Sequence, residues 1–217
     1  MPQKLFLLGA PAVGAAVVAI YIVHQRRIKD RARFIDKYRF PQRVWEKLSA
    51  QYPNLTETDV QQVEFALRDY FQICNGAGRR MISMPSQAVD VAWHEFILFT
   101  REYAQFCKRA LGRFLHHTPA EAMSTQTQAT MGIKRAWRLA CARERISPRT
   151  PERLPRLFAL DASLGIPDGF RYALNCVASA GAAQVFCASH IGCASGCGGE
   201  AGSSSDGDGG DGGCGGE

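Results

Sequence analysis

Apolar residues recur at helical spacing through most of the chain between residues 41 and 164. In one such run Val60, Val63, Leu67 and Phe71 follow one another three or four positions apart, which is the period of one face of an α-helix. No stretch shows the sustained alternation of apolar and polar residues that is typical of a half-buried strand. The pattern predicts an all-α fold, a helical bundle of about five or six helices.

Start and stop signals divide this pattern into helices. Pro41 is suited to a helix start, and Thr58 with Gln61 three residues later matches a capping box. Ser86 is placed to cap a long, central helix that continues to Gly112. Two further segments are expected to be helical, residues 118–145, in one piece or two, and residues 154–164.

The N-terminal segment from Leu5 to Val23 holds 19 residues without a charge. As a helix it would span about 28 Å, close to the hydrocarbon core of a bilayer, which is about 30 Å thick. We therefore expect residues 1–25 to form a single-pass transmembrane anchor. The alternative is a signal peptide cleaved near Ala10-Pro11-Ala12, but this would leave an apolar N-terminus with nothing to cover it.

Flanking charge predicts the direction of this anchor. Only Lys4 precedes the apolar segment, whereas seven basic residues follow it: Arg26, Arg27, Lys29, Arg31, Arg33, Lys37 and Arg39. Basic residues remain on the cytoplasmic side, so the body is expected in the cytoplasm. Residues 24–40 are expected to continue the helix out of the membrane, and residues 26–39 are expected to contact anionic lipid.

The net charge of +6 is unevenly distributed along the chain. No Lys or Arg follows Arg171, and five acidic residues do, so residues 1–171 carry +6 plus 5, or +11. A basic body suggests an anionic surface as partner, and the membrane is the nearest one. We expect no nucleic acid partner, because no base-reading or stacking motif is visible.

The chain falls into three parts: the anchor, a helical domain over residues 26–176, and a Gly/Ser/Cys-rich tail over residues 177–217. Gly202 to Glu217 has no apolar residue except Cys214 and is expected to be disordered. In a reducing cytoplasm the eight cysteines are expected to be thiols or metal ligands rather than disulfides. Three of them lie within apolar helical pattern and should be buried: Cys74, Cys107 and Cys141.

One group of residues in the body could carry chemistry. Asp90 and His94 are four apart and share a helix face, and His116 and His117 follow the predicted end of that helix. A carboxylate with two imidazoles can bind Zn²⁺ or another divalent metal and leave a position open to water. The alternative is a surface hydrogen bond between Asp90 and His94, with both later histidines facing solvent. Cys107 is excluded, since on one continuous helix it would point to roughly the opposite side.

The tail offers two weaker metal motifs. Cys193 and Cys197 have the spacing of half a zinc site, but only Cys214 follows as a second half. The acidic run from Asp206 to Asp211 resembles a calcium loop, yet it lacks the flanking helices and the glutamate of an EF-hand.

The central helix and the segment after it resemble a known family. Met84-Pro85-Ser86, Val89-Asp90-x-x-Trp93-His94-x-Phe96-Ile97, Tyr103-x-x-Phe106-Cys107 and Gly112-x-Phe114-x-His116-His117 are similar to the glycine-rich domain-containing protein-like family, formerly a domain of unknown function. The resemblance covers residues 55–120 well and 150–176 loosely. It implies a helical fold, brings no established activity, and makes Asp90, Trp93, His94, His116 and His117 the positions to test.

Two functions from different classes fit this sequence. In the first, the chain is a membrane-anchored binding or adaptor module with an unidentified protein partner and a metal or ligand site. In the second, it is a metal-dependent, hydrolase-like enzyme that uses Asp90, His94 and His116 or His117 to hold a metal that activates water. Metal analysis of the purified protein distinguishes them.

Overall fold

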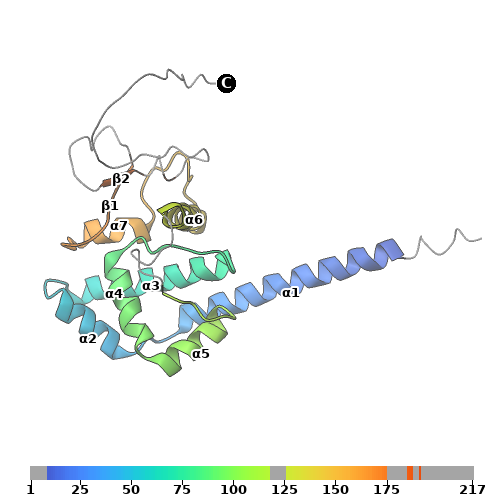
Figure 1. The fold of residues 1–217 in the computed structure, drawn as a ribbon, viewed down its shortest axis with the longest axis horizontal. Helices are drawn as coiled ribbons and strands as arrows, with labels where there is room; N and C mark the ends of the chain where they lie inside the picture. Colours follow the sequence, from blue (N-terminus) through green and yellow to red (C-terminus); the bar gives the residue numbers. More distant parts are fainter. Residues whose placement is uncertain (1–8, 118–125, 175–184, 188–190, 192–217) are drawn as a thin grey trace, which may run out of the picture.

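The computed structural model describes residues 9–117, 126–174, 185–187 and 191, which form the helical body drawn in Figure 1. Within these residues the elements are α1 (Gly9–Lys37), α2 (Gln42–Gln51), α3 (Glu57–Ala77), α4 (Gln87–Ile97), α5 (Thr100–Ala110), α6 (Gln126–Glu144), α7 (Arg156–Ser163), β1 (Arg171–Ala173) and β2 (Val185–Cys187). The predicted helical body is confirmed, because within the described residues seven of the nine elements are helices and the two strands are three residues each.

α3 is the central helix, since it contacts α1, α2, α4, α6 and α7. Aromatic side chains fill the space between α3 and its neighbours. The ring of Phe71 on α3 lies 4.7 Å from that of Phe106 on α5, and Phe40 after α1 lies 5.2 Å from Phe96 on α4. All four are buried, so one aromatic cluster joins α3, α4, α5 and the segment after α1.

The start of α3 differs from the prediction by two residues. Thr56, not Thr58, is the N-cap: its hydroxyl accepts a hydrogen bond from the Asp59 backbone N–H, and the Asp59 carboxylate accepts one from the Thr56 N–H. The expected capping box of Thr58 and Gln61 is therefore wrong. Thr56 and Asp59 have the same spacing, and a carboxylate also interacts favourably with the positive end of the helix.

The long helix predicted from Ser86 to Gly112 is wrong, because the chain bends at Leu98 and Phe99 and forms α4 and α5. Packing explains the break. On a straight helix Phe96 and Phe106 would be about 15 Å apart. In the folded chain their rings are 5.3 Å apart, so both helices bury their apolar faces in one core. Leu98 at the bend is exposed.

α1 continues without interruption from Gly9 into the body (Figure 1). The helix expected over residues 24–40 is present as far as Lys37, and residues 38–40 follow its end. Its second half packs on α3, where Gln72 donates a hydrogen bond to the carbonyl of Ala32 (2.9 Å) and Asn75 donates one to the carbonyl of Ile28 (3.0 Å). Its first half projects away from the body (Figure 1). The large apolar side chains there are 43–70% exposed: Val17, Val18, Ile20, Tyr21, Ile22 and Val23.

Residues 5–8 of the predicted membrane segment lie outside the described part of the chain. Among the residues that are described, no helix combines the length and the apolar character needed to cross a bilayer.

β1 and β2 form a parallel two-stranded sheet in which Arg171 pairs with Val185 and Ala173 with Cys187. β2 and the buried Ile191 lie within the stretch assigned to the tail from its composition. The expected disorder of Gly202 to Glu217 falls outside the described residues. Cys187 is disulfide-bonded, so the expectation that every cysteine is a thiol or a metal ligand is wrong at this position.

The other three described cysteines are free and buried in the core, as predicted. Burial raises the pKa of Cys74 to about 12 and that of Cys141 to about 11, and it also raises the pKa of Cys107. These thiols are neutral at physiological pH and act as small apolar side chains.

A buried carboxylate, that of Asp161, connects α7 to the start of α4. Asp161 on α7 is 1% exposed and accepts hydrogen bonds from the Ser86 hydroxyl (2.6 Å) and from the backbone N–H groups of Gln87 (2.7 Å), Ala88 (3.3 Å) and Phe170 (2.9 Å). Two of these donors are N–H groups in the first turn of α4, which have no partner within the helix, and a third is the hydroxyl of its N-cap, Ser86. Asp161 therefore fixes α4 on α7.

Replacing Asp161 with Asn should lower the free energy of unfolding by about 3 kcal/mol, because the amide NH₂ cannot accept the bonds that one carboxylate oxygen accepts. Urea unfolding of the purified protein, followed by tryptophan fluorescence, measures this. The control is Asp30→Asn, whose side chain is 66% exposed, and which should change stability by less than about 0.5 kcal/mol. Equal effects of the two substitutions would contradict the structural role of Asp161.

Candidate metal centre

Two residues of the candidate site lie on one face of α4. Asp90 and His94 are one turn apart, and their side chains are 21% and 52% exposed. The helix carries them on its outer side, because the opposite side, with Val89, Trp93 and Phe96, is buried in the core. The His94 side chain therefore faces water.

The third side chain comes from the segment that follows α5. Gly112 ends that helix with φ of +69°, a conformation in which glycine is favoured, and the chain then returns along α4. Two buried hydrogen bonds hold it there. The Trp93 indole N–H donates to the Tyr103 hydroxyl (3.1 Å), which donates to the Leu115 carbonyl (2.6 Å). His117, two residues later, is thereby placed beside Trp93, with ring centroids 4.7 Å apart.

His117 completes a compact group with Asp90 and His94. The Nε2 atom of His117 lies 3.0 Å from one carboxylate oxygen of Asp90, and the Nδ1 atom of His94 lies 3.5 Å from the other. The two imidazole rings are 3.9 Å apart, and one potential ligand atom of each residue lies within 4.8 Å of the others. Asp90 therefore bridges both histidines.

His116, also a candidate, is not in this group. Its exposed ring lies against Phe114, with centroids 4.8 Å apart. Exposure alternates along this segment: Phe114 and His116 are exposed, whereas Leu115 is buried and His117 is half-buried. Alternate side chains point to opposite sides, so only one of two neighbouring histidines can face Asp90.

The group offers two imidazole nitrogens and a carboxylate, which are ligands that Zn²⁺ and similar ions accept. Ligands of one zinc ion lie about 2.0–2.2 Å from the metal, so their own separations are about 3–4 Å. The separations of 3.0 and 3.5 Å, which go to the two different oxygens of Asp90, fall in this range. With one ligand atom from each residue the separations extend to as much as 4.8 Å, so a bound metal would draw the three side chains closer together. Because His94 is half exposed, a metal held here would keep a side open to water.

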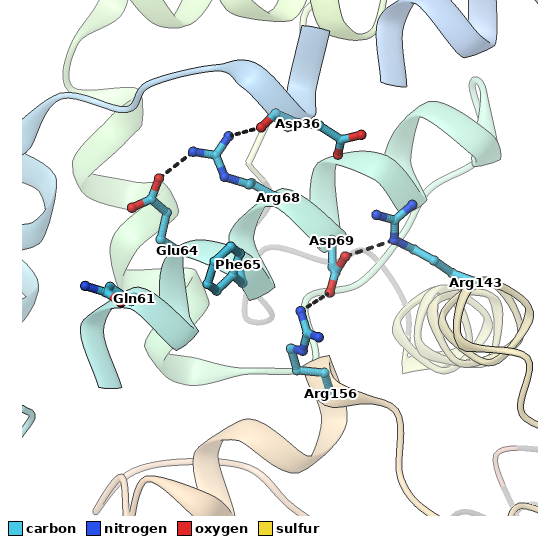
Figure 2. Close-up of a pocket in the computed structure, with 8 residues that line it drawn as sticks. All are labelled: Asp36, Gln61, Glu64, Phe65, Arg68, Asp69, Arg143 and Arg156. Atoms are coloured by element: carbon cyan, nitrogen blue, oxygen red, sulfur yellow. Dashed lines mark hydrogen bonds and ion pairs between the residues drawn. The ribbon is translucent and has the colours of Figure 1, made fainter. Parts of the chain in front are cut away.

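An open pocket of about 580 Å³ lies elsewhere on the body, between α3, α6 and α7 (Figure 2). Asp69 in this pocket accepts bonds from Arg143 (2.9 Å) and Arg156 (3.3 Å), and Arg68 pairs with Glu64 (2.5 Å). Its charges are thus used to connect three helices. None of the candidate ligands lines it, so the pocket and the candidate site are separate.

Most of the chain matches the model of one protein family. The UCP032817-like model matches residues 30–191, about three quarters of the sequence. The chain belongs to the UCP032817-like family. The matched region holds all three clustered residues and β2, but it begins within α1 and stops before the glycine-rich end. No curated protein and no solved structure matches the chain.

The UCP032817-like domain also contains positioning residues that sequence analysis did not identify. Asp161 and Tyr103 form the contacts that place α4 and the His117 segment. One signal was available for Asp161: it is a charged residue within the apolar run Leu157, Phe158, Leu160 and Leu164, where a carboxylate needs specific donors.

Replacing Tyr103 with Phe should lower the free energy of unfolding by about 2 kcal/mol, since the Trp93 N–H and the Leu115 carbonyl both lose a buried partner. It should also broaden or shift the NMR signals of His117 while those of His116 change less. The control is Tyr38→Phe, whose hydroxyl donates to Glu102 at the surface and should contribute less than about 1 kcal/mol. Unchanged His117 signals in folded Tyr103→Phe would refute this positioning role.

Proposed function

We propose that this chain is a membrane-anchored helical module whose body binds a divalent metal ion, zinc being the best match, through Asp90, His94 and His117. The observation that supports it is the convergence of these three side chains from two separate segments. Surface histidines that only bond to a neighbouring carboxylate do not need a buried hydrogen-bond relay to position them, whereas His117 has one.

The anchor is supported by the exposure of α1. Six large apolar side chains between Val17 and Val23 have no cover from the body, and in water this would be unfavourable by about 25 cal/mol per Å² of apolar surface. Leu5 to Leu8 would extend the same apolar run. Insertion into a bilayer removes this surface from water, and the basic residues that follow match the interface.

The direction of insertion rests on the basic residues after Val23, which favour a cytoplasmic body. One observation opposes it: Cys187 is disulfide-bonded, and disulfides persist mainly in oxidising compartments. The charge asymmetry is the larger effect, because it acts during insertion and involves seven residues against Lys4.

A reporter that is active only in the cytoplasm, fused after Glu217, should therefore be active in cells, because charge asymmetry sets the orientation of a single-pass anchor. An enzyme that is active only outside should be inactive at the same position. The reverse pattern would contradict the proposed topology without affecting the metal site, and release of the protein by alkaline carbonate would contradict the anchor itself.

The metal site predicts that His117→Gln and Asp90→Asn each weaken the binding of one Co²⁺ ion, used as a probe for zinc, by at least about ten-fold. His94→Gln should have a similar effect, because it removes one of three protein ligands. Isothermal titration and the visible spectrum of Co²⁺ measure this on full-length, untagged protein in detergent. The matched control is His116→Gln, which removes the neighbouring imidazole and should leave the affinity unchanged.

The cobalt spectrum also separates this site from the cysteine-rich tail, since thiolate ligands add an intense charge-transfer band that histidine and carboxylate do not. If His116→Gln weakens binding as much as His117→Gln, or if all binding carries thiolate bands, the proposed site is wrong.

A hydrolase-like activity is the second candidate, and the exposure of His94 favours it, because a metal with an open side can bind and activate water. The metal-loaded protein would then cleave simple activated esters, and His117→Gln would abolish that cleavage. Stoichiometric metal binding without any such cleavage supports the binding module instead. The resemblance to the glycine-rich domain-containing protein-like family is compatible with either function.

A further inference from the structure

Three segments that are far apart in sequence place basic residues around the point where α1 leaves the body. We call them the basic collar. Its nine members are Arg26, Arg27, Lys29 and Arg31 on α1, Arg79 and Arg80 after α3, and Lys108, Arg109 and Arg113 at the end of α5 and after it. Seven are exposed, and Arg31 and Arg113 are half-buried. Among the other residues of these segments, Asp30 is the one acid, and it pairs with Arg33.

Contacts with α1 show that the C-terminal ends of α3 and α5 both point toward the half of α1 that projects from the body. Along α3, Arg68 bonds to the carbonyl of Ile35, Gln72 to that of Ala32 and Asn75 to that of Ile28. α3 therefore runs antiparallel to α1 (Figure 1). By the same spacing, the next turn of α3 extends to about the level of His24.

α5 has the same direction relative to α1. The Tyr38 hydroxyl donates to Glu102 near the start of α5, whereas the Arg109 guanidinium lies 4.5 Å from the centre of the Phe34 ring. Just after α5, a Cβ at Gly112 would collide with the guanidinium of Arg31, so the two segments are in close contact there. The bond from Arg113 to the Gly78 carbonyl (2.9 Å) joins the ends of α3 and α5.

The nine basic residues of the collar have no acidic partners. Within the described part of the chain, no ion pair involves any of them, whereas Arg68, Arg143, Arg153 and Arg156 elsewhere on the body pair with carboxylates. Lys108 and Arg109 also interact favourably with the negative end of α5, but this does not account for the residues in the middle of α1 or after α3.

We propose that the collar binds the headgroups of anionic lipids and holds the body against the membrane surface. The proposal rests on the anchor proposed above and extends it, because five of the nine residues come from the body. A lipid surface is favoured over nucleic acid by position: the collar borders the turns of α1 that expose Val17 to Val23. Basic residues beside an apolar helix are typical of a protein that contacts an anionic membrane.

The test uses full-length protein reconstituted in vesicles of phosphatidylcholine, with or without phosphatidylserine, that contain a trace of dansyl-labelled lipid. All three tryptophans, Trp45, Trp93 and Trp137, belong to the body, so energy transfer to dansyl reports its distance from the membrane. We expect higher transfer when phosphatidylserine is present, and we expect high salt to remove the difference because it screens exposed charges.

The deciding variant is the triple substitution Arg79→Gln, Arg80→Gln and Lys108→Gln, which should lose the phosphatidylserine-dependent transfer while the anchor keeps the protein in the vesicles. The matched control removes three exposed basic residues elsewhere, through Arg43→Gln, Lys47→Gln and Arg149→Gln, and should respond as the unaltered protein does. Circular dichroism verifies that both variants are folded.

The collar would be overturned if phosphatidylserine had no effect on the unaltered protein, or if both triple variants showed the same loss. Binding of an RNA or DNA probe that the collar variant loses, without any response to phosphatidylserine, would also overturn it. Failure of the anchor is distinguishable. In that case carbonate releases the protein from vesicles, and a functional collar would still produce salt-reversible binding that requires phosphatidylserine.

Discussion

The buried carboxylate of Asp161 is the contact on which the arrangement of the body depends. An ionised group in the core is unfavourable unless donors surround it, and Asp161 obtains them from the Ser86 hydroxyl, the first N–H groups of α4 and Phe170. The positive end of the α4 dipole points at the same carboxylate. α4 therefore has one favourable direction on α7, and the positions of Asp90 and His94 follow from it.

A second buried contact sets the other side of the site. Tyr103 accepts from Trp93 and donates to Leu115, so its hydroxyl is satisfied only when α4, α5 and the following segment are all in place. This brings His117 to within 3.0 Å of Asp90. The three proposed ligands thus depend on two polar contacts in a largely apolar core, and both contacts lie away from the solvent-facing side of the site.

The helices could be predicted from the sequence because apolar residues repeat at helical spacing, and the pairing of Asp90 with His94 follows from their separation on one helix. The break at Leu98 could not be predicted, because it results from contacts between Phe96 and Phe106 that only the folded core reveals. The strands β1 and β2 are three residues each, too short for an alternating pattern to be visible.

The choice between His116 and His117 shows more clearly what could not be predicted from the sequence. The two residues are identical and adjacent, so composition and spacing treat them alike. What separates them is the hydrogen bond from Tyr103 to the Leu115 carbonyl, which determines the side of the segment that faces α4. Asp161 is similar, since its donors at residues 86–88 are more than 70 positions away in sequence.

The uninterrupted course of α1 has a mechanical consequence. No proline or glycine lies between Ile22 and Lys37. Gln72 and Asn75 donate hydrogen bonds to the backbone of the second half of α1. The helix and the body therefore behave as one rigid arm. From Val23 to Lys37 this arm is about 21 Å long. If α1 inserts into a bilayer as proposed and its first turns tilt by about 20°, a common value for helices in bilayers, the far end moves by about 7 Å. Any change in helix tilt would therefore be transmitted directly to the body.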